Sequence, residues 1–295
     1  VPESRAQRPR RPDPVGQVMV IVALASLTYA IIEGPRAGWS APQIAGLFAL
    51  SAVALAALAI YEPRRPDPLL DLRFFRSAPF AGAVLTAVCA LAALGGFLFL
   101  NTIYLQEVRG FSALRAGLYM VPMAAMTVLL APLAGRIISV RGPRLPLLGA
   151  GLGMTVGAAM LTGLARGTPD AWLLAAYVIF GIGAALVNPP ITNTAVSGMP
   201  RAQAGVAAAV ASTSRQVGQS LGVAVTGAVA TSALHAPLRT GFAEASHGAW
   251  WIVTGCALAA GIIGTVTSGA WARRTADQTA RRLMADEARV PVGTS

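Results

Sequence analysis

The sequence has 295 residues, of which 55% are apolar and only 12% are charged, and its mean hydropathy is +0.62. This composition is typical of a membrane protein and, with the long apolar runs described below, excludes a soluble globular protein. The formal net charge of +11 raises the question of nucleic-acid binding, which the positions of the charges decide.

The first 77 residues predict a basic linker and two membrane spans. Residues 1–15 are rich in Pro and Arg and predict a cytoplasmic linker that buries no core. Because the chain begins in this linker, and with Val rather than Met, we expect a further segment to precede it. The apolar runs 16–33 and 43–61 can each cross a bilayer, which takes about 20 helical residues. The charged connector up to residue 77 is the best internal boundary.

Six further apolar runs follow this connector, at residues 78–106, 113–135, 145–165, 171–195, 203–232 and 249–271. The last residues, 273–295, predict a cytoplasmic tail with a short surface helix. We therefore predict an all-α polytopic membrane protein with eight transmembrane helices, in which two linker helices over 16–77 precede a six-helix bundle over 78–272.

The arginines alternate between the two sides of this predicted topology. All 23 basic residues are arginine, and with a cytoplasmic N-terminus 17 of them fall in inside segments and 5 in outside segments. This asymmetry follows the positive-inside rule and predicts a multi-pass protein of the cytoplasmic membrane with both termini cytoplasmic. Nucleic acid would require the charges on one folded face, so the partners that we expect are the lipid bilayer and small molecules, with no nucleic acid.

Arg215, in the stretch STSRQVGQSLGVAVTG, is the one formal charge inside the apolar runs, their ends excepted. On a helical wheel its side holds small or polar residues, namely Ala204, Ala208, Ala211, Ser212, Gly218, Gln219, Gly222 and Thr226. The opposite side collects Val206, Val210, Val217, Leu221 and Ala224. We expect the aliphatic side to face lipid and the small side, with Arg215, to face the bundle or a water-filled cavity. A central arginine costs about 2.5–3.5 kcal/mol on insertion scales, which favours a functional role, while a structural role tied to carbonyls and amides stays open.

Other polar residues at depth are Asn101, Asn188 and Asn193, the last two flanking Pro189 and Pro190. The sequence leaves two interpretations open for these asparagines: they contact a substrate, or they form hydrogen bonds between helices. No acidic residue lies at depth, and arginine stays protonated, so the sequence assigns no proton carrier. Catalytic motifs, Cys/His metal spacings and cofactor motifs are also missing from the sequence. We therefore expect no enzyme, no catalytic residue, no metal site and no cofactor.

Several segments together resemble a known family. GRIISVRGPR (135–144) resembles the second-half copy of the major facilitator loop motif, with matches at Gly135, Gly142 and Arg144. Ser139 and Val140 stand where the motif has Asp and Arg, so the resemblance does not extend to an ion pair there. With IEGPRAGWS (32–40), DLRFFRS (71–77), YLQEVRGFSALRAGLYMVP (104–122) and SRQVGQSLGVA (214–224), the chain resembles the fourteen-span drug:proton antiporters of the major facilitator superfamily.

This resemblance implies the C-terminal eight-span portion of a transporter, with an N-terminal six-helix half elsewhere. That half carries the membrane acid linked to proton coupling in the family. Substrate sites of this superfamily lie near the midplane between two halves, so the candidates for the second-half wall are Arg215, Gln216, Gln219, Asn188, Asn193 and Asn101. Gly135, Gly142 and Arg144 are the candidate gating residues of the loop motif.

The function that we expect is proton-coupled export of drugs or other amphipathic small molecules across the cytoplasmic membrane by the complete protein. Two alternatives stay open. One is a polytopic membrane enzyme or assembly subunit without transport activity. The other is a truncated transporter that is inactive because half of its cavity is missing.

Overall fold

The computed structural model describes residues 13–64, 72–196 and 204–289, and within these ranges every regular element is a helix. The helices in chain order are α1 (Pro14–Ala37), α2 (Pro42–Tyr61), α3 (Ala78–Ile103), α4 (Ala113–Arg141), α5 (Arg144–Ala159), α6 (Asp170–Val196), α7 (Ala204–Ser232), α8 (Leu238–Ala245), α9 (His247–Val266) and α10 (Ala270–Arg289). Short 3₁₀ turns occupy Glu62–Arg64 and Leu72–Arg76, and a π-helical turn, Tyr104–Val108, extends α3.

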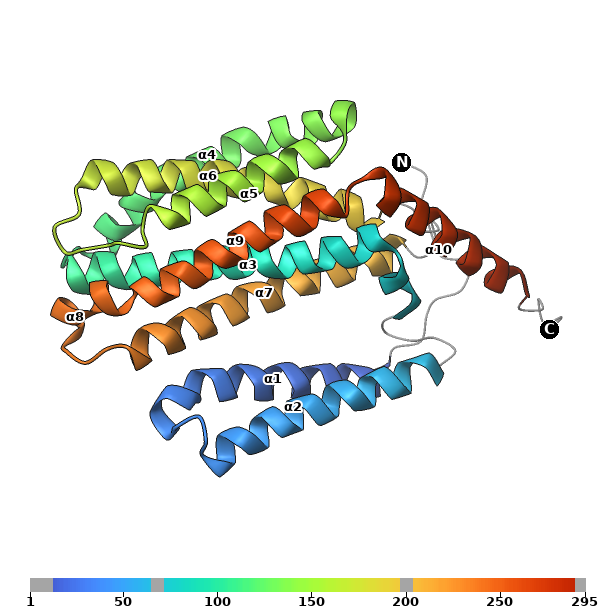
Figure 1. Ribbon diagram of the computed structural model, residues 1–295, viewed down its shortest axis with the longest axis horizontal. Helices are drawn as coiled ribbons and strands as arrows, with labels where there is room; N and C mark the ends of the chain where they lie inside the picture. The colour runs from blue at the N-terminus through green and yellow to red at the C-terminus, as the bar shows by residue number, and fades with distance from the viewer. Residues whose placement is uncertain (1–12, 65–71, 197–203, 290–295) are drawn as a thin grey trace.

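The long helices run side by side and alternate in direction along the chain (Figure 1). Helices α3 to α7 and α9 form one bundle, while α1 and α2 form a hairpin that reaches the bundle through contacts between α1 and α7. We call the two ends of the bundle the α10 end and the α8 end, after the short helices that lie there (Figure 1). Both the start of α3 and the α4–α5 turn lie at the α10 end, where α10 extends away from the bundle.

In the part of the chain that the structure describes, six helical segments are long and apolar enough to cross a membrane, namely Pro14–Ala37, Pro42–Tyr61, Ala78–Val108, Ala113–Arg141, Asp170–Val196 and Leu238–Val266. The predicted runs 145–165 and 203–232 are helical but are not among these six. Helix α5 is 16 residues long and is followed by turns at residues 160–163. Helix α7 is 29 residues long, but Arg215 and several Ser, Thr and Gln residues lower its hydropathy.

The core of the bundle contains many alanine and leucine side chains, together with stacked aromatic rings and closely packed glycines. Phe97 of α3 stacks on Phe180 of α6 with ring centroids 3.9 Å apart, and it makes an edge contact with Trp250 of α9 at 5.6 Å. Helices α3 and α7 approach so closely that a Cβ atom added to Gly218 would lie 2.4 Å from the Val88 carbonyl oxygen. The small-xxx-small spacing therefore brings two backbones together, as the sequence predicted.

The prediction for the other side of α7 was wrong in part. Ala224 is buried, and Val206 and Val210 pack against the core instead of facing lipid. The exposed strip of α7 is formed by Gly205, Ala209, Ser212, Thr213, Gln216 and Ser220. The reason is that α7 has neighbours on more than one side, because α1, α3, α6 and α9 all contact it.

The predicted helix near the C-terminus is present and longer than expected. Helix α10 begins at Ala270, before the predicted tail, and buries Ala272, Ala276 and Thr279 while Arg273 and Arg274 are exposed. The Thr275 hydroxyl accepts a hydrogen bond of 2.9 Å from the backbone N–H of Ala78. This contact attaches α10 to the first turn of α3.

Candidate functional site

The clearest polar contact of α7 is the one between Arg215 and Thr192 of α6. Arg215 is half-buried, and its Nη1 donates a hydrogen bond of 3.0 Å to Thr192 Oγ1. Thr192 is exposed and lies just beyond Pro189 and Pro190. A guanidinium has five N–H donors. Because this is the one hydrogen bond of the Arg215 side chain within the described residues, donors remain for water or a ligand.

The neighbours of Arg215 on α7 differ in their surroundings. Gln216 lies on the exposed strip together with Ser212 and Ser220. Gln219 is half-buried at the α3–α7 contact, where its backbone carbonyl oxygen would lie 2.5 Å from a Cβ atom added to Gly95. Gln216 therefore lies at the surface beside the half-buried Arg215, and Gln219 is placed to pack against α3.

The three candidate asparagines lie in different surroundings. Asn188 is half-buried on α6, and Asn193, one turn further along the helix, is exposed. Asn101 is fully buried between α3 and α6, where its Nδ2 donates to the Phe97 carbonyl at 2.9 Å and its Oδ1 accepts from the Tyr177 hydroxyl at 2.8 Å. Both ends of this amide are bonded, which favours a role in helix packing.

The three loop-motif residues take up distinct positions at the α10 end. Gly135 is exposed, with no atom within 4 Å of an added Cβ. Gly142 ends α4 with a φ of 78°, a conformation that favours glycine. Arg144 is the first residue of α5 and is exposed. Gly142 and Arg144 line the same cavity as Asn193, which joins part of the predicted loop motif to part of the predicted substrate wall.

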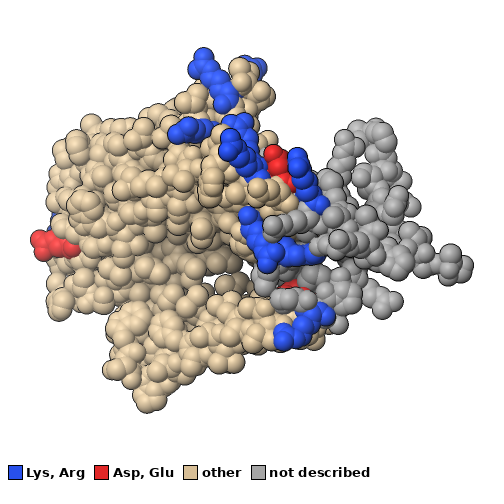
Figure 2. Space-filling view, turned by 45° about the vertical axis from the view of Figure 1, so that its right-hand side comes forward, with Lys and Arg blue, Asp and Glu red and all other residues tan. Residues whose placement is uncertain are grey.

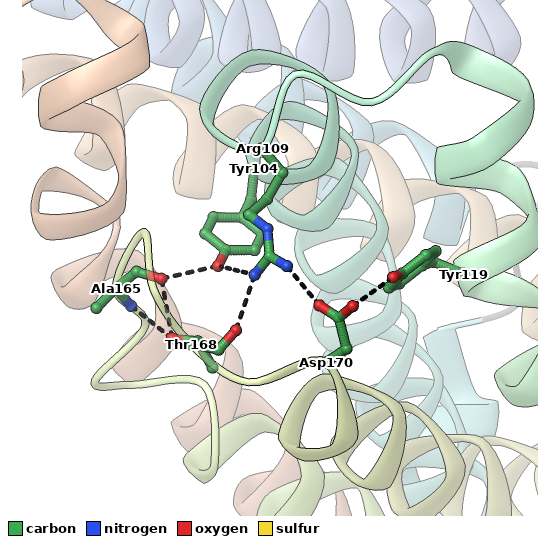
Figure 3. Close-up of polar contacts among 6 residues, drawn as sticks. All are labelled: Tyr104, Arg109, Tyr119, Ala165, Thr168 and Asp170. Atoms are coloured by element: carbon green, nitrogen blue, oxygen red, sulfur yellow. Dashed lines mark hydrogen bonds and ion pairs between the residues drawn. The ribbon is translucent and has the colours of Figure 1, made fainter.

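A polar cluster at the α8 end was not predicted from the sequence (Figure 3). Arg109, which follows the π-helical turn, forms an ion pair with Asp170, the first residue of α6. The other carboxylate oxygen of Asp170 accepts a hydrogen bond of 2.6 Å from the Tyr119 hydroxyl of α4. Arg109 also donates to the Thr168 carbonyl at 2.8 Å. The cluster therefore joins α3, α4 and α6 at one end of the bundle.

The Tyr104 hydroxyl completes this cluster by donating a hydrogen bond of 2.7 Å to the Ala165 carbonyl. Burial alone would lower the pKa of Arg109, but hydrogen bonds and charge interactions with Tyr104 and Asp170 outweigh it, so the pKa of Arg109 is raised. The only sequence signal for this cluster is an Arg and an Asp flanking separate apolar runs. That signal does not say which of the outside charges pair.

Comparison with known proteins shows the family to which this chain belongs. Residues 8–223 match the Major Facilitator Superfamily, so the chain belongs to this family of membrane transporters. The resemblance seen in the sequence is thereby confirmed at the level of the superfamily, and the alternative of a membrane enzyme is set aside because the family consists of transporters.

Similar proteins include drug-resistance and export proteins. The chain is 36% identical over 239 residues to the multidrug resistance protein Stp of Mycobacterium tuberculosis, covering 81% of this chain and 44% of the relative. It is 35% identical to the tetracenomycin C resistance and export protein of Streptomyces glaucescens, over 83% of this chain and 46% of that protein. The drug efflux pump JefA of M. tuberculosis is 32% identical, over 83% and 48%. The chain therefore spans less than half the length of these relatives.

Proposed function

We propose that this chain is the C-terminal part of a proton-coupled transporter that exports drugs or other amphipathic small molecules across the cytoplasmic membrane. The names of its relatives, which refer to multidrug resistance, antibiotic export and drug efflux, support the substrate class. The observation that carries the proposal is Arg215 on α7, which retains unbonded donors beside an exposed polar strip.

In this proposal eight helices cross the membrane, namely α1 to α7 and α9. Helix α5 and its following turns pass between the same two ends as α6 and α9, which it contacts. Helix α7 is less apolar because one strip of it faces a water-filled path instead of lipid. The domain limits that we propose are a basic linker over 1–15, two linker helices and a connector over 16–77, a bundle over 78–272 and a tail over 273–295.

The substrate wall in this proposal centres on Arg215 and Gln216 of α7, with Asn188 and Asn193 of α6 toward the α10 end. Gln219 and Asn101 lie deeper, so they reach a substrate only if α3 moves relative to α6 or α7. Gly142 and Arg144 form the turn between α4 and α5, where they act in gating as the bundle rocks against its partner.

The partner is an N-terminal six-helix half that packs against the open side of this bundle. Support comes from α4, which exposes a row of large apolar side chains: Leu114, Leu118, Val121, Val128, Leu129 and Leu133. A lipid-facing surface would also be apolar, but Gly135 on the same helix leaves open space that another helix can occupy. The proton carrier lies in that half, because no acid lies at depth in the spans of this chain.

We place both termini in the cytoplasm. Most of the arginine side chains in view gather at the α10 end, and a broad surface without charged side chains covers most of the rest (Figure 2). Positively charged loops stay on the cytoplasmic side during membrane insertion. The α10 end is therefore the cytoplasmic end in this proposal, and the cluster around Asp170 lies outside.

The test is dye efflux by the complete protein in a bacterial host that lacks its own drug pumps. We expect export of a cationic dye that stops when a protonophore collapses the proton gradient. Export that continues without the gradient would contradict proton coupling, and no export of any tested drug by the well-expressed protein would contradict the transport proposal. Expression of residues 1–295 alone tests the remaining alternative, in which this chain by itself does not transport.

A further inference from the structure

A cavity of about 610 Å³ lies at the α10 end of the bundle, and Arg215 does not line it. The turn between α4 and α5 forms one wall, and the segment between α9 and α10 forms another. The side chains of α6 and the start of α3 complete it. The lining residues that matter chemically are Arg141, Arg144, Asn193, Thr194, Thr267, Ser268 and Arg273.

The charge of this cavity is positive. Arg141, Arg144 and Arg273 line it, and no acidic side chain is among its described lining residues. None of these three arginines forms an ion pair with another described residue. Three guanidinium groups that share one cavity repel one another, so an anion between them stabilises the arrangement.

Two helices begin at this cavity. Arg144 is the first residue of α5 and Ala270 is the first residue of α10, and both residues line it. Pro143, before α5, caps no N–H with its side chain. The first N–H groups of a helix lack intrahelical partners and carry partial positive charge, so helix starts favour anions.

A buried hydroxyl without a partner gives independent support. Thr194 lines the cavity, is 5% exposed, and its Oγ1 has no hydrogen-bond partner among the described residues. In contrast, Thr267 in the same wall donates to the Ile263 carbonyl at 2.7 Å, and Ser268 donates to the Gly264 carbonyl. A buried hydroxyl that bonds to nothing costs about 1–3 kcal/mol, which a bound acceptor would remove.

We propose that this cavity binds a phosphate group, carried either by the headgroup of an anionic phospholipid or by a soluble phosphate. Arginine forks match phosphate oxygens with paired hydrogen bonds, and the Thr194 hydroxyl donates to one further oxygen. A single carboxylate offers two oxygens, fewer than this donor set can bind. A lipid source is supported by Trp271, which follows the lining residue Ala270 and is 63% exposed, because Trp is enriched at bilayer interfaces.

The test uses the complete protein and compares two probes. In the first arm the protein is purified from membranes that contain phosphatidylglycerol and phosphatidylcholine, and native mass spectrometry measures the lipids that it retains. In the second arm the melting temperature of the delipidated protein is measured with about 10 mM inorganic phosphate and, for comparison, with chloride at equal ionic strength. The variants are R144Q/R273Q and Thr194→Val, the latter of nearly the same shape as the native residue.

We expect preferential retention of phosphatidylglycerol by the native protein if the source is lipid, or stabilisation by inorganic phosphate without lipid preference if the source is soluble. Each lost charge-assisted hydrogen bond lowers binding by roughly tenfold or more, so R144Q/R273Q loses the response, and Thr194→Val weakens it by about tenfold or less. Arg274→Gln, an exposed arginine next to Arg273 that does not line the cavity, is the matched control and keeps the native response.

Two results would overturn the proposal. One is that neither probe binds, or that both variants bind it as the native protein does. The other is that R144Q/R273Q changes the melting temperature equally with and without either probe, which indicates that an acidic group of the protein itself covers the arginines. If R144Q/R273Q does not fold, Thr194→Val alone decides. None of these readouts depends on transport, so they stand apart from the efflux test.

Discussion

At the scale of single residues, Arg215 carries most of the functional argument. Its position halfway along α7 was the strongest signal in the sequence, because a charge there is costly in a membrane. The structure adds that one hydroxyl, that of Thr192, meets one of its five donors. A purely structural arginine would be expected to have its donors satisfied by carbonyls and amides. We therefore expect a ligand or ordered water to complete its hydrogen bonding.

Replacing Arg215 with Ala in the complete protein removes these donors. We expect dye efflux to fall by about tenfold or more, since hydrogen bonds to charged groups contribute about 1.5–3 kcal/mol, while the amount of protein in the membrane changes little. The measurement is the efflux rate divided by the membrane level from immunoblotting. Arg36→Gln, at an exposed position in the last turn of α1, serves as the control. An equal loss of efflux and membrane level would contradict the functional role and indicate that Arg215 is structural.

Tyr119 tests the cluster at the α8 end. Phe at this position keeps the ring and removes the hydrogen bond of 2.6 Å to Asp170. We expect a loss of about 1 kcal/mol in stability, which corresponds to a lower melting temperature by roughly 2–4 °C. Differential scanning fluorimetry in detergent measures this change. Tyr29→Phe removes a hydroxyl from an exposed tyrosine and should leave the melting temperature in place. A loss of equal size in both variants would contradict the role given to the cluster.

The candidate residues show what a sequence can and cannot predict at this scale. Arg215 was found because its charge contrasts with its surroundings in a single helix. The pairing of Arg109 with Asp170, and the meeting of Arg144 with Arg273 in one cavity, depend on residues far apart in the chain. A pattern in neighbouring residues does not predict which residues far apart in the chain lie close together in space. Asn101 illustrates the opposite case, since the sequence marked it as polar at depth but could not supply its partner, Tyr177.

At the scale of elements, hydropathy predicted helices α1 to α7 and α9 to within a few residues at most of their ends. Differences arose where a turn lay inside an apolar run. The run 145–165 becomes a helix only as far as Ala159, because the turns at residues 160–163 continue the run without a charged residue. The faces of α7 were predicted less well. A helical wheel separates small from large residues but does not reveal how many neighbours the helix has.

The close contact of α3 and α7 leads to a prediction about Gly222. An added Cβ atom here would lie 2.1 Å from the Ala92 carbonyl oxygen, so Gly222→Val must push the two backbones apart. Overpacking of this kind costs about 1–3 kcal/mol. We expect lower thermal stability and weaker efflux. Gly205→Ala, on the same helix in open space, should match or exceed native stability, because alanine favours a helix. Equal melting temperatures for both variants would contradict the observed packing.

At the scale of the whole molecule, composition and the arginine pattern predicted a polytopic membrane protein, and the family match confirms a transporter superfamily. In the proposal above, the exposed strip of α7 forms one wall of the substrate path. Arg215 and the exposed strip of α7 have no opposing wall among the described residues. Hydropathy and charge along the chain predict that such a strip exists, but they do not give the position of the surface that faces it.

Co-expression tests the two-half arrangement. We expect residues 1–295 alone to reach the membrane without exporting dye, and export to return when the proposed N-terminal six-helix half is expressed as a separate chain. The physical reason is that the apolar face of α4 and the polar strip of α7 need a partner surface. Efflux rates with and without the second chain provide the measurement. Full export by residues 1–295 alone would contradict the arrangement.

The central claim is that the exposed strip of α7 faces an aqueous substrate path, and cysteine labelling tests it most directly. Gln216→Cys is introduced into the complete protein after its other cysteines, including Cys89 and Cys256, have been replaced. We predict that a charged, membrane-impermeant maleimide labels residue 216 and that an exported drug slows this labelling. A residue 216 that resists the charged reagent but reacts with a lipid-soluble one would lie against acyl chains, and that result would contradict the account.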